Sequence, residues 1–165
     1  MVTNLPPQYP HCKDPYSFES GLDFQDYVAT KLHDILGVTI TNYQSMRWQF
    51  ADGENRQGIE IKLDRDCIRT KRLSIEIAEK TKATNAEYVP SGIYRNDNSW
   101  LYIQGTWLVI FVFAKSLLKL LHRSGRYEGH TLPTLMGYYL PFDDAYKYAA
   151  KVLEFDKNGI LLAKG

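Results

Sequence analysis

Two short stretches of the chain alternate apolar and charged residues, and they carry the residues best suited to catalysis. The first covers positions 59–64 and the second covers positions 73–78. Their charged members are Glu60, Lys62 and Asp64 in the first stretch and Glu76 in the second. Side chains two positions apart share one face of a β-strand, so each stretch predicts a strand with one charged and one buried apolar face. We expect these two strands to pair as a hairpin across the turn at 65–72.

Carboxylates gathered on one face of such a hairpin favour a divalent cation. They repel one another and lose hydration, and a hard cation that prefers oxygen ligands relieves both costs. The expected ion is Mg²⁺, for which Mn²⁺ can substitute, bound by Asp64, Glu76 and Glu60. Such an ion lowers the pKa of a coordinated water and stabilises charge on a phosphodiester. Lys62 or Lys80 would position the attacking water.

The charged face also has a simpler interpretation. Alternating charged residues on a strand are most often its solvent face, held by cross-strand Glu–Lys pairs. Surface pairs of this kind contribute only about 0–1 kcal/mol to stability, so they need no functional explanation. The pattern alone leaves both interpretations open.

Basic residues lie between the two charged strands, namely Arg65, Arg69, Lys71 and Arg72. Beside a metal site they would contact nucleic-acid phosphates, which supply most of the sequence-independent affinity. The alternative is the ordinary solubility of a turn. A second basic stripe, formed by Lys115, Lys119 and His122, is better explained as the solvated face of a helix.

The elements that position these residues follow from caps and periodicity. Residues 1–17 hold several prolines and predict an N-terminal arm without regular structure. A helix is expected over about 21–36, with Ser20 as its N-cap and Gly37 as its C-cap. Further strands are expected at 38–41, 46–50 and 100–104.

The second half of the chain predicts one more strand and two helices. The wholly apolar run 107–113 predicts a strand buried on both faces. A helix follows over about 115–123, ending near Gly125, and a last helix is expected over about 143–155. This order of elements favours an α/β domain with a mixed central β-sheet flanked by helices.

Composition excludes several classes of protein. The 165 residues fit a single domain over 1–165, and 44% hydrophobic with 24% charged residues excludes wholesale disorder. A net charge of +1 means that any basic surface must be local. Two cysteines cannot build a disulfide scaffold or a four-cysteine zinc site. The longest apolar run is far shorter than the ~20 residues of a membrane helix, and no signal peptide is recognisable. We therefore expect a cytoplasmic protein, bacterial or from a phage-infected host, without a membrane partner.

The run Gly58–Asp64 followed by Leu73–Lys80 resembles the PD-(D/E)XK nuclease superfamily, of the phage and bacterial type, which has the restriction-endonuclease-like fold. That family places an Asp at the end of one strand, and a later strand carries an acid, one spacer and a lysine. In this resemblance Asp64 is the first acid, and Glu76 is the second. The resemblance spans about 21–123.

The motif lysine is replaced by Ala78, so the resemblance implies Lys62 or Lys80 as the substitute, with Lys62 ranked first. The acid of the leading helix would be Asp26 or Glu19. What the resemblance implies is a Mg²⁺-dependent endonuclease that hydrolyses DNA phosphodiester bonds. A homodimer is the matching assembly, because two copies are needed to cut both strands. The alternatives are an inactive nucleic-acid-binding module and a phage adaptor on the same fold.

Overall fold

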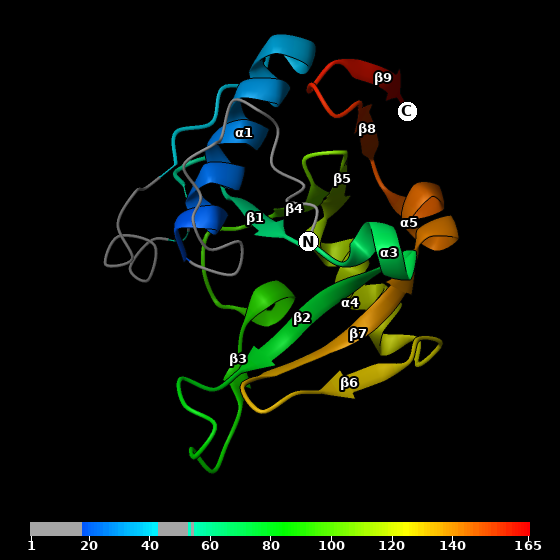
Figure 1. Ribbon diagram of the computed structural model, residues 1–165. Coiled ribbons are helices and arrows are strands. Elements are labelled where there is room, and N and C mark those ends of the chain that lie inside the picture. The colour runs from blue at the N-terminus through cyan, green and yellow to red at the C-terminus, as the bar shows by residue number, and fades with distance from the viewer. Residues whose placement is uncertain (1–17, 43–52, 54) are drawn as a thin grey trace.

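A computed structural model describes residues 18–42, 53 and 55–165. Figure 1 shows two β-sheets that meet near the middle of the molecule, with helices packed around them. The first sheet has the strand order β1-β4-β5-β8-β9. Its strands are β1 (Ile59–Leu63), β4 (Leu101–Thr106), β5 (Val109–Ala114), β8 (Lys151–Phe155) and β9 (Leu161–Lys164). β1 runs parallel to β4 and the other pairs are antiparallel, so this sheet is mixed.

The second sheet is antiparallel throughout, with the order β3-β2-β7-β6. Its strands are β2 (Arg72–Glu79), β3 (Val89–Pro90), β6 (Gly129–Thr131) and β7 (Leu135–Pro141). The helices are α1 (Phe18–Leu36), α3 (Cys67–Thr70), the 3₁₀-helix η1 (Gly92–Tyr94), α4 (Lys115–Arg123) and α5 (Phe142–Tyr148). The chain is therefore an α/β protein with one mixed and one antiparallel sheet, flanked by helices.

The predicted hairpin between the two charged strands is wrong, because β1 and β2 belong to different sheets. The segment between them forms the helix α3 rather than a tight turn, and Cys67 of this helix is fully buried. At its end Lys71 adopts the left-handed conformation (φ 54°) and redirects the chain into β2. β1 instead pairs with the distant strand β4.

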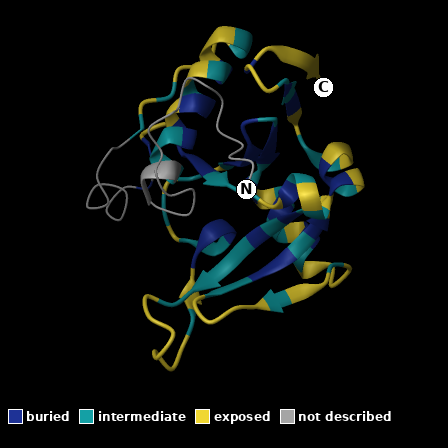
Figure 2. Cartoon of the chain, viewed as in Figure 1, coloured by how far each residue is buried: buried dark blue, intermediate teal, exposed yellow. Residues whose placement is uncertain are grey.

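Two apolar cores lie on opposite faces of the mixed sheet. On one face α1 packs through Phe24, Tyr27 and other residues against Ile59 and Ile61 of β1. On the other face, residues of β4 and β5 pack against the second sheet, α4 and α5. Figure 2 shows the buried residues concentrated in these layers, whereas the loop before β3 is exposed. The β1 residues that do not face α1 therefore point toward the second sheet.

Several predicted elements match the structure closely. The alternating stretches form β1 and β2, and the helix predicted at 115–123 has the bounds of α4. The first helix begins earlier than expected, at Phe18, but ends as expected at Gly37, which has a φ of 68°. The predicted strand at 46–50 and the arm at 1–17 lie outside the described residues, and 38–41 forms no strand.

The buried strand predicted at 107–113 is confirmed as β5, which starts two residues later, whereas the last predicted helix is wrong beyond Tyr148. The apolar run at 107–113 begins with the turn between β4 and β5, where buried Trp107 packs against α1. The last helix, α5, ends at Tyr148, and β8 occupies the rest of the predicted span. Hydrogen bonding to the open edge of β5 outweighs helix continuation there, as the Ala150 N–H donates to the Val112 carbonyl.

Within the described ranges, none of the helices is long and apolar enough to cross a membrane.

Candidate active site

The charged face of β1 is directed at the second sheet. Ile59 and Ile61 pack against α1, so the alternation of the strand turns Glu60 and Lys62 to the opposite side. Glu76 of β2 meets them there from the second sheet. The junction of the two sheets thus collects charged side chains that the predicted hairpin would have placed on a solvent face.

Lys62 bridges the two sheets by contacting one carboxylate from each. Its Nζ lies 3.4 Å from Glu60 Oε1 and 3.7 Å from Glu76 Oε2. The Glu76 side chain is 14% exposed and that of Lys62 is 30% exposed, so solvent reaches the junction from one side. Two acids from separate sheets converge here on one positive charge, and we call this group of three residues the Lys62 junction.

Glu60 is almost completely buried and is supported from behind by a second lysine. Lys115, the first residue of α4, is equally buried, and its Nζ lies 3.7 Å from Glu60 Oε2. The same ammonium contacts Asp97 Oδ1 at 3.2 Å and donates to the Arg95 carbonyl oxygen at 3.2 Å. It also donates to Ser99 Oγ. Lys115 therefore fixes Glu60 through a fully satisfied ammonium rather than through a mobile surface pair.

The electrostatic balance differs between the two acids around Lys115. Burial raises the pKa of Glu60, an effect that Lys62 and Lys115 only partly offset. Burial also acts to raise the pKa of Asp97, but hydrogen bonds from Ser99 and Lys115 outweigh it and lower that pKa overall. Glu60 is thus a carboxylate whose ionised form still gains from further positive charge.

Asp64 lies just past the end of β1 and is held by both sheets. Its Oδ2 accepts hydrogen bonds from the Ser74 N–H of β2 and from Gln104 Nε2 of β4, each at 2.8 Å. Gln104 Nε2 also donates to the Ser74 carbonyl oxygen at 2.8 Å. Burial raises the pKa of Asp64, although the Ser74 and Gln104 hydrogen bonds act to lower it. Asp64 is therefore fixed in orientation by β4 and by β2, the strand that carries Glu76.

A histidine completes this side of the site. Ser74 Oγ and His130 Nε2 of β6 are 2.8 Å apart. Burial, together with the positive charge of Arg72, lowers the pKa of His130, so its ring is neutral near pH 7. The His130 ring also packs at 4.5 Å between centroids against Tyr139. The neutral ring holds the hydroxyl of the residue whose N–H binds Asp64.

The structure brings together Glu60, Lys62 and Glu76, and it holds Asp64 through Ser74 and Gln104. It separates the second candidate lysine from them. Lys80 follows the end of β2, and its Nζ lies 4.3 Å from the centre of the Tyr88 ring. Of the two candidates for the motif lysine, Lys62 is therefore the one beside Glu76.

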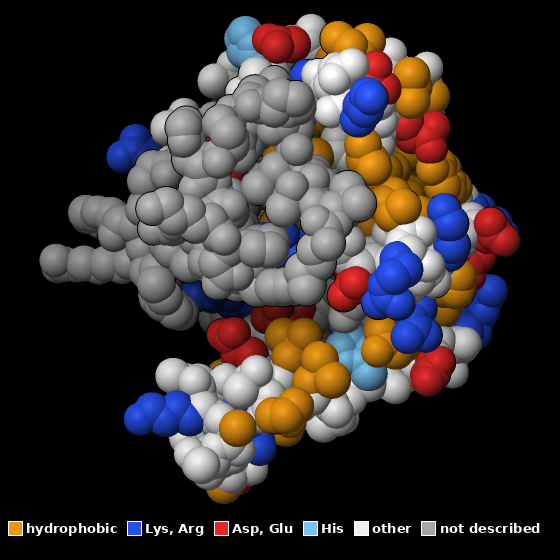
Figure 3. All heavy atoms as spheres, viewed as in Figure 1, with side chains coloured by type: hydrophobic (Ala, Val, Ile, Leu, Met, Phe, Trp, Pro, Cys, Tyr) orange, Lys and Arg blue, Asp and Glu red, His pale blue; other side chains and the backbone are white. Residues whose placement is uncertain are grey.

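The basic residues between β1 and β2 are divided among different partners. Arg69 pairs with Asp66 at 3.0 Å, and Arg72 stacks on Tyr139 with its guanidinium carbon 3.5 Å from the ring centre. Arg65 is half-buried, and Lys71 points toward α5. Figure 3 shows basic and acidic side chains intermixed over the region of α3 and α5. Phosphate binding by these four residues stays a prediction.

The leading helix lies across the mixed sheet from the Lys62 junction. α1 packs on the Ile59 and Ile61 face of the mixed sheet, whereas Glu60 lies on the opposite face. Asp26 of α1 is exposed, and the side chain of Glu19 lies outside the described residues.

Sequence reasoning missed several residues of this site. Lys115 was assigned to a solvated helix face, although its position directly after the apolar run of β5 was a signal for burial. Asp97 and Gln104 carried no such signal, because their contacts come from segments distant in the sequence. His130 was not among the candidate residues identified from the sequence, and its partner is Ser74.

Two buried oxygen atoms at the site accept no hydrogen bond from the described residues, Glu60 Oε2 and Gln104 Oε1. Both are hard oxygen donors of the kind that Mg²⁺ prefers. In the described part of the chain, no three His, Cys, Asp or Glu side chains are grouped closely enough to hold a metal ion. A cation would therefore use Glu60 and Glu76 in competition with Lys62.

Searches for related proteins add no identity to this geometry: no family model, no curated protein and no solved structure matches the chain.

Proposed function

We propose that the chain is a Mg²⁺-dependent nuclease that hydrolyses DNA phosphodiester bonds on a restriction-endonuclease-like core. One observation supports this most strongly, namely that carboxylates from two separate sheets converge on a single cation, the ammonium of Lys62. A solvated face held by cross-strand pairs does not account for Glu60, which is only 3% exposed. The convergence suits a site that binds positive charge.

A divalent cation at the junction would have to displace the Lys62 ammonium from its two carboxylates. Glu60 and Glu76 would then hold the ion, with Asp64 as a third acid, and Gln104 offers a buried carbonyl oxygen without a hydrogen-bond donor among the described residues. When bound, such an ion supplies a more acidic water and stabilises negative charge on the phosphate. Lys115 would keep Glu60 in place and would favour its ionised form.

Lys62 has two roles in this proposal. Its ammonium neutralises the paired acids when the ion is absent, which avoids the cost of two uncompensated carboxylates in a partly buried place. During hydrolysis the same ammonium would orient the attacking water and offset charge that develops on the phosphate. It substitutes for the family lysine, whose position in this chain holds Ala78.

The test is cleavage of supercoiled plasmid and branched DNA in Mg²⁺ or Mn²⁺. We expect wild-type protein to cut, and Glu76→Gln and Asp64→Asn to lose about 100-fold or more in rate. Glu79→Gln is the matched control, because Glu79 lies on the same strand outside the junction and should retain full activity. If neither DNA is cut with either ion, the nuclease proposal fails.

Calorimetric titration with Mn²⁺ tests the metal site separately. Glu76→Gln should weaken binding by at least about tenfold. Lys62→Met should strengthen binding, since it removes the competing ammonium, and should still lower the cleavage rate. Unchanged Mn²⁺ affinity in both variants would refute the assignment of the site.

A second function, a non-cutting nucleic-acid-binding or phage adaptor module, is favoured by the same ion pairs. Lys62 already neutralises Glu60 and Glu76, and Ala78 replaces the family lysine. This alternative predicts no heat of Mn²⁺ binding in the calorimetric titration and no DNA cleavage. Salt-dependent DNA binding in that case would identify the binding module, and its absence would identify the adaptor.

A further inference from the structure

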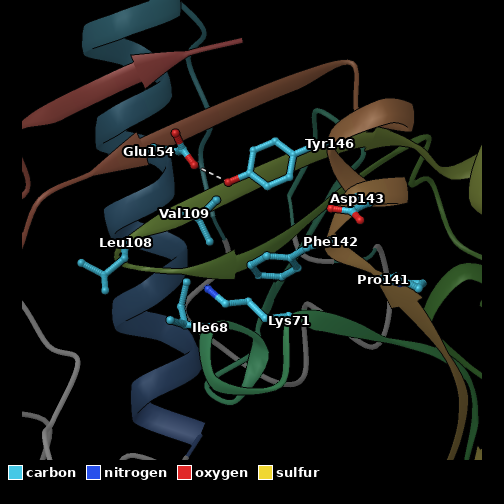
Figure 4. Close-up of a pocket in the computed structure, with 9 residues that line it drawn as sticks. All are labelled: Ile68, Lys71, Leu108, Val109, Pro141, Phe142, Asp143, Tyr146 and Glu154. Atoms are coloured by element: carbon cyan, nitrogen blue, oxygen red, sulfur yellow. Dashed lines mark hydrogen bonds between the residues drawn. The ribbon is translucent and has the colours of Figure 1, made fainter.

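A cavity of about 400 Å³ lies where α3, α5 and the strands β5 and β8 meet (Figure 4). Its floor is apolar: Val109 and Phe142 are buried, and Ile68 of α3 forms one wall. The Phe142 ring belongs to an aromatic cluster with Phe111 at 5.2 Å and Tyr146 at 6.1 Å between centroids. We call this cavity the α5 pocket. Its volume lies within the range of small-molecule sites.

Three charged residues line the α5 pocket, Lys71, Asp143 and Glu154, and Figure 4 shows Lys71 and Glu154 on either side of its apolar floor. On one side lies Lys71, whose Nζ is 5.8 Å from the centre of the Phe142 ring. On the other side lies Glu154, whose Oε1 accepts a hydrogen bond from the Tyr146 hydroxyl. Glu154 therefore faces the pocket with a fixed orientation.

Lys71 and Glu154 both reach the pocket through local departures from regular backbone. Lys71 is the one non-glycine residue with positive φ within the described ranges, and that conformation costs free energy in a bulky side chain. Glu154 lies at the register shift between β8 and β9, where a bulge redirects side chains. Two separate backbone irregularities thus place Lys71 and Glu154, which carry opposite charges, in the lining of one cavity.

The hydrogen-bonding capacity of the pocket defines what it accepts. Burial and the neighbouring Glu154 raise the pKa of Tyr146 to about 12, so its hydroxyl remains a donor at neutral pH. A carboxylate has about four acceptor positions, and Tyr146 uses one of them. Glu154 therefore retains acceptors for N–H groups of a ligand.

We propose that the α5 pocket binds a guanine nucleotide. The flat base fits an apolar floor beside Phe142, and its adjacent N1–H and N2–H₂ groups match the acceptors of Glu154. The phosphate would pair with Lys71 on the other side of the floor. Thymine presents one N–H between two carbonyl oxygens, which the carboxylate repels. Asp143 adds a negative charge to the lining of the pocket. Added salt should therefore weaken nucleotide binding less than it weakens binding to a uniformly basic site.

This inference deepens the proposed nuclease function and rests on it for its role. Lys71 is the left-handed C-cap of α3 and directly precedes β2. The same strand carries Glu76, and its Ser74 N–H binds Asp64. The α5 pocket and the candidate active site are thus connected through the start of β2. The pocket would select a guanine in the nucleic acid that the active site cleaves.

The experiment is calorimetric titration of the full chain with dGMP and dTMP in EDTA, which removes any contribution from a metal. Short single-stranded oligonucleotides with one guanine or with thymine alone form a second arm. The test variants are Glu154→Gln and Lys71→Met, and Glu128→Gln, an exposed site on the same molecule, is the control. Thermal melts of each variant report whether it is folded.

We expect dGMP to bind at least about tenfold more tightly than dTMP, and both test variants to lose about tenfold. Preference seen only with the guanine oligonucleotide would assign the pocket to single strands rather than to free nucleotides. Equal binding of dGMP and dTMP in both arms, or unchanged affinity in folded Lys71→Met, overturns the proposal. These measurements use no metal, so their outcome does not depend on whether the protein cleaves DNA.

Discussion

Replacing Lys115 with Met should destabilise the fold more than almost any other lysine substitution. The variant keeps most of the apolar side-chain volume but removes the ammonium from Glu60 and Asp97. Lys115 and Glu60 are each only 3% exposed, so solvent cannot replace the lost partner. Breaking a buried pair by removing one member costs about 3–5 kcal/mol. We expect a loss of this size in the free energy of unfolding.

The assay is urea unfolding at neutral pH, with Lys151→Met as the control. Lys151 is exposed on β8, so its replacement should change the free energy of unfolding by less than about 0.5 kcal/mol. The double variant Lys115→Met with Glu60→Gln should be more stable than the sum of the two single losses predicts. The reason is that the amide leaves no uncompensated charge behind.

The pH dependence sharpens this prediction. Burial raises the pKa of folded Glu60, so between the ordinary Glu pKa and the raised value the folded state binds more protons than the unfolded state. Stability from this group therefore falls as pH rises through that window. Without Lys115 the pKa of Glu60 rises further, and the deficit of the variant should grow as the pH rises above the ordinary Glu value. A loss below about 1 kcal/mol, or a deficit that does not change with pH, would refute the buried-pair argument.

Three further predictions concern the same region. Gly92→Ala should lower the free energy of unfolding more than Gly125→Ala does and should weaken Mn²⁺ binding. The new Cβ at position 92 collides with the Glu76 carbonyl oxygen, whereas Gly125 has open space around it. Urea unfolding and calorimetric titration compare the two variants. Gln104→Leu should lower the free energy of unfolding by about 1–3 kcal/mol by removing a buried donor to Asp64, and an unchanged urea midpoint would contradict this. The raised pKa of Asp64 means that its contribution to stability falls as pH rises above the ordinary Asp value, so Asp64→Asn should flatten that part of the pH–stability curve.

Local sequence patterns correctly predicted the position and the buried face of β1. They did not predict which strand pairs with it. The alternation of residues 59–64 determines which side chains share a face, and Ile59 and Ile61 are buried as expected. The partner of β1 depends on β4, which lies about forty positions away in the register Ile61 to Ile103. No local spacing encodes that pairing, so a neighbouring strand was preferred and a parallel one was missed.

The candidate site shows the same division. Glu60, Lys62 and Glu76 were identified because their alternation is visible in the sequence, and the structure brings them together despite the wrong hairpin. The support from Lys115 and Asp97 was not identified, because it arises where α4 meets the loop before β4. Helical spacing alone predicted that Lys115 is exposed to solvent. Its burial depends instead on the segments that cover the first turn of α4.

The hydrogen bond from the Ser74 N–H to Asp64 gives this protein an intrinsic spectroscopic probe. An amide proton bound to a carboxylate changes its chemical shift when that carboxylate gains a proton or accepts an ion. In a ¹⁵N-labelled sample, the Ser74 cross-peak would therefore follow the ionisation of Asp64 during an acid titration. The same cross-peak would respond to added diamagnetic cations, without an attached label or a substrate.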